Sequence, residues 1–324
     1  MNYIVFDLEW NQSPNGQAGE HPRIPFEIIE IGAYKLSDSY EIIGDFRRLI
    51  TPKIYKRLHK YIRTILNYDE RELKSNGVDF KSACTDFLEW CGEGLSEGEE
   101  YAFCTWGTAD LFCLQNNMDF YRMEKLPFPL KYFNIQQIFG EMYLKNSDIC
   151  KLEKAVDMLK IEMDKPFHAA INDAYYTARV MQRAHLKNLK EKYTYDIYRH
   201  PKSKDEEILD FHNSIIERIT MEYPSKRDAM SNKELSGVVC PKCGKPTKRR
   251  VKWFQMNGGN QVAVGKCLIH GNVMATIKFK PASDSRDDVF AIERVEKIKR
   301  RKYIELKDKR EKMLEKKRII REIS

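Results

Sequence analysis

Two kinds of hydrophobic pattern alternate along the first 190 residues. Short apolar runs rich in β-branched and aromatic residues predict strands, whereas apolar positions three or four residues apart predict helices. The predicted strands are three within residues 1–50, the last two forming a hairpin, followed by 101–106 and 132–135. The predicted helices are 58–66, 80–91, 110–118, 152–159 and 170–189. This order is typical of an α/β fold in which helices flank a mixed sheet.

The pattern changes after residue 190. Apolar residues at helical spacing predict an amphipathic helix over about 205–221, and the polar stretch 221–237 predicts a linker. The apolar residues at that spacing are Ile208, Phe211, Ile215 and Ile219. Residues 252–264 predict a β-hairpin around two adjacent glycines, and the charged segment from about residue 289 predicts a helix with few apolar positions.

Charge is distributed unevenly over the 324 residues. The whole chain has a formal net charge of +8. Residues 238–324 contain 24 Lys+Arg and 10 Asp+Glu, so residues 1–237 have a net charge of −6. A basic segment of this kind offers phosphate-binding groups to a nucleic acid. A solubilising tail and a binding site for an acidic protein are the alternatives.

The composition predicts a cytoplasmic protein with a large core. Hydrophobic residues make up 42% of the chain, and no apolar run approaches membrane-spanning length. The N-terminal apolar run lacks a basic start and is interrupted by acidic residues, unlike a signal peptide. Five of the eight cysteines lie in apolar surroundings and are interpreted as buried residues of a reducing compartment. These five are Cys84, Cys91, Cys104, Cys113 and Cys150. We expect no membrane contact, and the sequence sets no oligomeric state.

Asp7 and Glu9 are the first candidates for chemistry. They follow an apolar run, and side chains two positions apart share one face of a strand. We therefore expect both carboxylates to project together at the end of a core strand. Two close carboxylates repel each other and are costly to desolvate, and a divalent cation removes that cost. A strand end that reaches solvent is the alternative.

Two further aspartates and a histidine lie near predicted helix starts. Asp110 follows the predicted strand 101–106, and His168 lies five residues before Asp173 in the first turn of the predicted helix 170–189. Carboxylates favour the first turn of a helix. Each of these residues, taken alone, therefore also suits an ordinary helix start or cap.

Together these residues resemble the motifs of a known enzyme group. Asp7-Leu8-Glu9, Asp110 and His168-x4-Asp173 resemble, in order and setting, the three motifs of the DEDDh exonucleases within the RNase-H-like superfamily. Residues 27–36 resemble that group's second strand, and residues 134–136 resemble the strand after the second motif. The resemblance covers about residues 1–190. Within the group, the chain looks most like the branch that holds the KapD-type proteins and the ERI-type RNA 3′ exonucleases.

The resemblance implies a 3′-5′ exonuclease. Such an enzyme hydrolyses single-stranded nucleic acid from a free 3′ end and releases nucleoside 5′-monophosphates, and the similar branch favours RNA as substrate. A single-stranded DNA exonuclease is the first alternative. A catalytically silent adaptor that binds RNA or ribosomes through its C-terminal part is the second.

The resemblance also assigns roles to individual residues. Four carboxylates are expected to hold two Mg²⁺ or Mn²⁺ ions, with Glu9 also counted as catalytic. These metal ligands are Asp7, Glu9, Asp110 and Asp173. His168 is expected to act as the general base. The residues expected to contact the terminal nucleotide are Leu8, Glu9, Trp10 and His168.

A second chemical signal lies in the C-terminal part. Cys240 and Cys243 form one knuckle, and Cys267 and His270 form another after 23 intervening residues. Two such knuckles offer four soft ligands for tetrahedral Zn²⁺. With the predicted hairpin between them, the segment resembles a zinc ribbon with a closed structural site. A redox cysteine pair and a fourth ligand other than His270 are the alternatives.

These observations divide the chain into four expected parts. Residues 1–190 form the RNase-H-like exonuclease domain, and residues 191–237 form a helical linker region. Residues 238–282 form a small zinc-ribbon-like β module. Residues 283–324 form a basic helical tail that ends in the predicted charged helix.

Overall fold

The computed structural model divides the chain into two compact units, Met1–Tyr198 and Arg199–Ser324. It describes residues 1–66, 70–96, 99–145, 148–184, 189–212, 214–256, 258–282 and 287–323. Among the described residues, no helix combines the length and the apolar character that crossing a membrane requires.

The first unit is built on a six-stranded mixed sheet with the order β3-β2-β1-β4-β5-β6. Its strands are β1 (Asn2–Gln12), β2 (Phe26–Leu36), β3 (Ile42–Leu49), β4 (Tyr101–Thr105), β5 (Lys131–Asn134) and β6 (Thr194–Tyr195). The pairs β1/β2, β2/β3 and β5/β6 are antiparallel, whereas β1/β4 and β4/β5 are parallel. The predicted mixed sheet, including its N-terminal hairpin, is confirmed.

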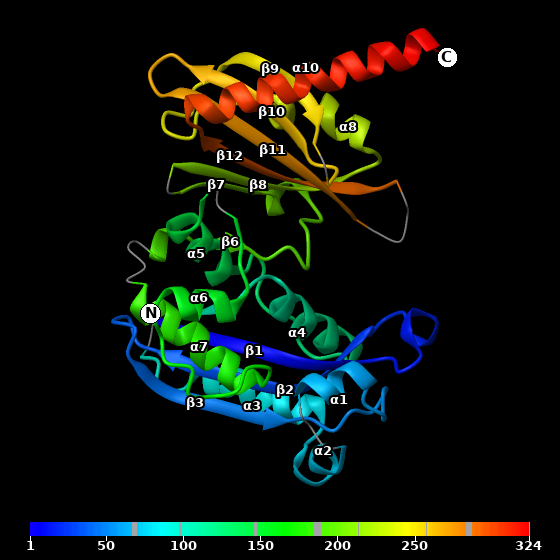
Figure 1. Cartoon of the computed structure of the whole chain (residues 1–324), viewed down its shortest axis with the longest axis vertical. Coiled ribbons are helices and arrows are strands. Elements are labelled where there is room, and N and C mark those ends of the chain that lie inside the picture. Colours follow the sequence, from blue (N-terminus) through cyan, green and yellow to red (C-terminus); the bar gives the residue numbers. More distant parts are fainter. Residues whose placement is uncertain are drawn as a thin grey trace. The chain divides into compact units, whose positions relative to one another are not determined.

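Helices cover both faces of this sheet (Figure 1). They are α1 (Lys60–Leu66), α2 (Glu70–Asn76), α3 (Phe80–Gly92), α4 (Ala109–Phe120), α5 (Ile135–Tyr143), α6 (Leu152–Met158) and α7 (Ala170–Arg183). The predicted helix 170–189 thus ends at Arg183, and residues 185–188 of that prediction lie outside the described residues.

The side chains of β1 alternate between two cores. Phe6 and Leu8 pack with α3 and α4, whereas Tyr3 and Val5 pack with α5, α6 and α7. Successive side chains of a strand point to opposite faces. Continuing the Tyr3–Val5 series therefore places the next odd-numbered residues on the α7 side of the sheet.

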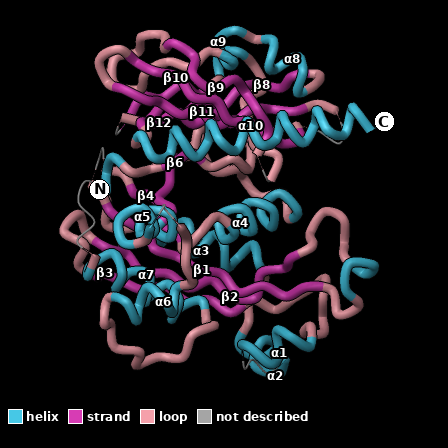
Figure 2. The backbone as a smooth tube through the Cα atoms, turned by 45° about the horizontal axis from the view of Figure 1, so that its top comes forward, coloured by secondary structure: helices cyan, strands magenta, loops and turns pink. Residues whose placement is uncertain are grey.

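The second unit is a six-stranded antiparallel sheet with the order β7-β8-β12-β11-β10-β9. Figure 2 draws the strands of both units in magenta. Its strands are β7 (Ile208–His212), β8 (Ile215–Tyr223), β9 (Lys248–Gln255), β10 (Gln261–Cys267), β11 (Gly271–Pro281) and β12 (Val289–Lys297). Its helices are α8 (Lys226–Ser231), α9 (Lys233–Ser236) and α10 (Arg300–Ile323). The predicted hairpin is present as β9 and β10, and the basic C-terminal helix is present as α10.

The predicted amphipathic helix over 205–221 is wrong, because this segment forms the hairpin β7-β8. Ser214 lies between the two strands with a φ of 58°, a left-handed conformation that an α-helix does not contain. The β-branched isoleucines of this segment suit strands, and β8 gains a long-range partner in β12. The apolar spacing alone did not reveal that partner.

Two further predictions for this unit, a linker and the start of the last helix, differ from the structure. The predicted linker 221–237 contains α8 and α9, whose Ala229 and Leu235 pack against the buried Ile277 and Ala291. The predicted helix from about residue 289 begins only at Arg300, because the preceding residues form the largely buried strand β12. Residues 283–286 of the predicted tail lie outside the described residues.

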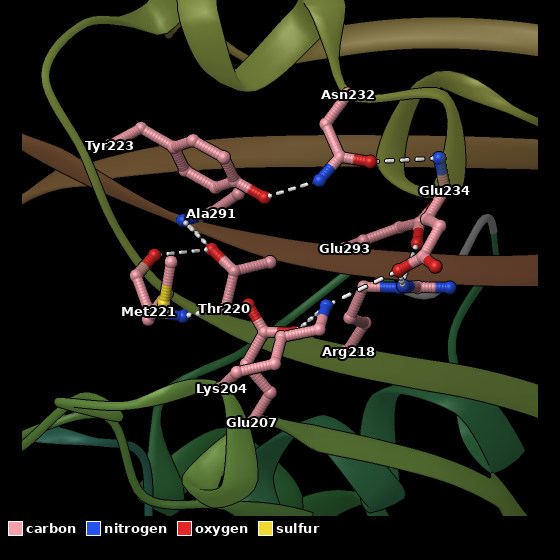
Figure 3. Close-up of polar contacts among 10 residues, drawn as sticks. All are labelled: Lys204, Glu207, Arg218, Thr220, Met221, Tyr223, Asn232, Glu234, Ala291 and Glu293. Carbon is pink, nitrogen blue, oxygen red and sulfur yellow. Dashed lines mark hydrogen bonds and ion pairs between the residues drawn. The ribbon is translucent and has the colours of Figure 1, made fainter.

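A buried charge network ties β8 to β12 in the second unit (Figure 3). Glu293 is 2% exposed, and its Oε2 lies 3.1 Å from Nε of Arg218 on the neighbouring strand. Beside this pair, Oγ1 of Thr220 accepts a hydrogen bond from the backbone N–H of Ala291 at 3.0 Å, where the β12 register shifts. Burying a charge is costly unless it is paired, so Arg218 offsets part of the cost of burying Glu293.

Candidate active site and cysteine cluster

Asp7 and Glu9 lie on the α7 side of β1. In the β2 register, Asp7 pairs with Gly32 and Glu9 pairs with Glu30, and a bulge follows between Glu9 and Trp10. Their position differs from the expected strand end, because β1 continues to Gln12. The parallel pairing of β1 with β4 stops at Val5, so both carboxylates lie just past the end of the paired segment.

Two helix starts bring the other acids to the same place. One carboxylate oxygen from each of Asp7, Glu9 and Asp173 lies within 4.8 Å of the others. Asp110, in the first turn of α4, accepts a hydrogen bond through Oδ1 from the backbone N–H of Leu8 at 3.2 Å. The four acids predicted as metal ligands are thus gathered at residues 7–9 of β1.

The first turn of α7 lies directly on β2. A Cβ atom at Gly32 would lie 2.1 Å from the backbone N of Ile171, so only glycine permits this approach. Glu30 accepts a hydrogen bond from the backbone N–H of Ala170 at 3.2 Å and pairs with Nε of Arg47 at 2.7 Å. Because Asp173 follows in the same turn, these contacts hold it beside β1.

The electrostatics of the acids favour a cation. Burial, and then the neighbouring carboxylates, raise the pKa of Asp7 well above its ordinary value and that of Glu9 to about 9. Burial raises the pKa values of Asp110 and Asp173 to about 7. In addition, the buried Oδ1 of Asp173 has no hydrogen-bond partner within the described part of the chain. A hard divalent cation fits this set, because it neutralises the charges and takes oxygen ligands.

His168 is joined to the acids through its backbone. Its N–H donates to Oδ2 of Asp173 at 3.2 Å, and its φ is 67°, in the left-handed region. The imidazole is 51% exposed and has Nε2 at 3.9 Å from Oε1 of Glu153 on α6. Glu153 was not singled out by the sequence, and its only local signal is its place in the first turn of a helix.

The residues expected to contact the nucleotide lie in different settings. The side chain of Leu8 is 3% exposed and packs in the core, so only its backbone faces the acids. Trp10 is partly buried, and its ring lies 5.9 Å from that of the more exposed Phe26. Phe26 begins β2 just after a proline, and the sequence analysis did not single it out.

The second predicted metal cluster is also assembled. Nδ1 of His270 lies 3.4 Å from Sγ of Cys240 and 3.7 Å from Sγ of Cys267, and Cys243 and Cys267 lie 3.8 Å apart. Backbone hydrogen bonds from His270 and its neighbour lower the pKa of Cys267 to about 6, which favours the thiolate that binds metal. All eight cysteines are free thiols. Three sulfurs and one imidazole nitrogen in one cluster suit a closed tetrahedral Zn²⁺ site.

Comparisons with solved structures agree with the fold of the first unit. No curated protein matches the chain. One similar solved structure is "crystal structure of full-length 3'-exonuclease", with a TM-score of 0.50 and 20% identity over 60% of this chain and 84% of that one. A second is "3'-end specific recognition of histone mRNA stem-loop by 3'-exonuclease", with a TM-score of 0.51 and 19% identity over 60% of this chain and 84% of that one. A third is the "nuclease domain of 3'hExo, a DEDDh family member, bound to rAMP", with a TM-score of 0.51 and 20% identity over 60% of this chain and 96% of that one. At these identities they show a shared fold.

The family assignment comes from the sequence itself. The model of the RNase T exonuclease family matches residues 4–181, more than half of the chain. The matched segment contains the five motif residues and most of the sheet of the first unit. The chain therefore belongs to the RNase T exonuclease family.

Proposed function

We propose that the first unit hydrolyses single-stranded RNA from its 3′ end by a two-metal mechanism and releases nucleoside 5′-monophosphates. The observation that carries the proposal is the convergence of Asp7, Glu9 and Asp173, with Asp110 bonded to the residue between the first two. Asp110 is buried and the other three carboxylates are partly buried, and the described residues place no ion-pair partner beside them, so the group suits divalent ions.

The acids and the histidine have different roles in this mechanism. Asp7, Glu9, Asp110 and Asp173 would hold two Mg²⁺ or Mn²⁺ ions, which would supply an activated water and stabilise the charge on the phosphodiester. His168 takes the proton of the attacking water as general base. Its half-exposed ring leaves room for a substrate, and its backbone bond to Asp173 keeps it at the site.

The 3′ end is recognised next to the first motif. Trp10 follows Glu9 directly, and an indole stacks on any base, which suits an enzyme that removes every nucleotide in turn. Glu9 and His168 contact the terminal sugar and phosphate. Leu8 contributes through its backbone, because its side chain is buried.

The cysteine cluster holds one structural Zn²⁺. All four ligand positions are supplied by the chain, so no open position is left for a substrate. The ion stabilises the second unit, where Cys240 and Cys267 are part of the same buried core as Val273 and Val295.

One experiment tests the proposal. RNA and DNA strands of the same sequence, labelled at the 5′ end, are incubated with the protein and Mg²⁺, with EDTA as control. We expect a ladder of products shortened from the 3′ end, faster on RNA, and no cleavage with EDTA. Faster cleavage of DNA would favour the DNA exonuclease alternative. An intact strand of both kinds would favour the adaptor.

A further inference from the structure

The second unit carries most of the positive charge of the chain. Residues 199–324 contain 31 Lys+Arg and 18 Asp+Glu, whereas residues 1–198 contain 25 and 30. The exonuclease unit therefore carries a net charge of −5, which repels a polyanionic substrate until its metal ions are bound. Affinity for a long nucleic acid requires cations elsewhere, since phosphate contacts supply most of the binding free energy.

A groove in the second unit gathers such cations around an apolar floor. It lies where α10 packs over β9, has a volume of about 340 Å³, and is lined by Phe254, Gln255, Met256, Lys309, Lys312, Met313 and Lys316. Leu306 anchors the helix in the core formed with Val251, Phe254 and Val264. The floor is thus part of the folded sheet.

The charges of α10 are arranged by helical face. A helix turns 100° per residue, so Lys309, Lys312 and Lys316 share the face of Met313. At the same 100° per residue, Asp308, Glu311 and Glu315 lie on the side of the helix opposite Met313. Lys309 pairs with Glu305 at 2.8 Å, whereas Lys312 and Lys316 form no ion pair with any described side chain. The groove face therefore keeps unneutralised positive charge.

A second pair of cations lies on the same sheet. Lys266 of β10 and Lys248 of β9 are both exposed and are direct cross-strand partners. Like charges directly opposite each other destabilise a sheet, and one lysine would suffice to protect an edge strand from aggregation. Lys266 continues the series Val262–Val264, which faces α10. The cations therefore lie at both ends of β9.

We propose that this track, from Lys248 and Lys266 to the groove at Lys312 and Lys316, binds the backbone of single-stranded nucleic acid. Lysine side chains contact successive phosphates, and the Met256–Met313 floor accommodates a base between them. The inference rests on the proposed function, because the bound strand is the substrate of the first unit. Its 3′ end would then be cut while upstream nucleotides stay bound.

The decisive variant is Lys312→Glu/Lys316→Glu. The matched control is Lys307→Glu/Arg318→Glu, which changes the same charge on the opposite face of α10. Binding is measured by fluorescence anisotropy of a labelled 20-nucleotide RNA in the Asp7→Asn background, which keeps the strand intact. We expect the groove variant to bind at least about 10-fold more weakly and to lose about 1.4 units of the slope of log K against log salt, since each single-strand phosphate contact contributes about 0.7. The control should change affinity less than about 3-fold.

The same variants with a wild-type active site separate the two proposals. We expect the groove variant to have a raised KM on the 20-nucleotide RNA and unchanged hydrolysis of a dinucleotide, whose one phosphodiester is taken up by the active site. Equal affinities of the two double variants for RNA would overturn the proposal that the track binds nucleic acid. Binding of an acidic peptide, but not of RNA, by the Asp7→Asn protein would also overturn it. Absent hydrolysis with intact groove binding would instead count against the proposed activity alone.

Discussion

Glu30 of β2 accepts a hydrogen bond from the backbone N–H of Ala170, the first residue of α7, at 3.2 Å. The two residues are 140 positions apart in the chain. A carboxylate at a helix N-terminus satisfies free N–H groups and the helix dipole. Here it also places Asp173, three residues into the helix, beside the acids of β1.

Replacing Glu30 with Gln should therefore weaken catalysis although Glu30 is not expected to touch the substrate. We expect a loss of about 10–100-fold in Mn²⁺ affinity or in turnover, which is typical when a residue that orients metal ligands is changed. Mn²⁺ titrations of dinucleotide hydrolysis measure both. Arg47→Gln should show part of this loss, because Arg47 pairs with Glu30, whereas Arg48→Gln, which breaks an exposed pair with Asp86 and leaves the Arg47–Glu30 pair, should not. Equal effects of the two arginine variants would contradict this role.

Asp7→Asn separates activity from stability. The amide removes one metal ligand, and turnover should fall at least about 100-fold. The metal-free protein should be as stable as the wild type or more so, because burial and the neighbouring acids raise the pKa of Asp7 and make its ionised form costly. Thermal unfolding in EDTA, beside the hydrolysis assay, checks both parts. Wild-type turnover by this variant would remove the basis of the assigned site.

His168→Ala tests the general base. Turnover should fall by about 10²–10⁴-fold, while Mn²⁺ affinity should stay near the wild-type value, because His168 contacts Asp173 only through its backbone. Isothermal titration of Mn²⁺ and single-turnover hydrolysis give the two numbers. Glu153→Gln is the companion variant, since it removes the carboxylate next to the ring. If His168→Ala lost metal affinity and kept its rate with saturating metal, the residue would be a ligand instead.

The sequence predicted the first unit well for a physical reason. Its motif residues sit on elements with strong local signals, such as the apolar run before Asp7 and the amphipathic α7. The role of Glu30 depends on a contact 140 residues away, which no local pattern contains. The second unit was harder, because residues 208–219 fit helical spacing and strand propensity equally. Only the pairing of β8 with β12 decides between them.

Cys240→Ser should remove the zinc and disturb only the second unit. Oxygen replaces a soft thiolate ligand, and structural zinc sites contribute directly to folding. We expect loss of about one bound Zn²⁺ per chain by metal analysis, faster amide exchange in β9–β11, and unchanged dinucleotide hydrolysis. Cys150→Ser is the matched control, because Cys150 is a buried free thiol of the first unit. An equal loss of dinucleotide hydrolysis would mean that the cluster contributes to the active site.

Because of Glu293, the free energy of unfolding of the second unit should fall as the pH rises. Burial raises its pKa to about 7, against the opposing effect of Arg218. Between about pH 4.5 and 7 the folded state keeps the proton that the unfolded state has lost, so raising the pH favours unfolding, and above pH 7 the loss is complete. The shift corresponds to about 3 kcal/mol of unfolding free energy. Opening free energies of β8 and β12 amides from hydrogen exchange at pH 5 and pH 8 should show this fall, and Glu293→Gln should reduce it. A variant with the same fall as the wild type would assign the pH dependence to other groups.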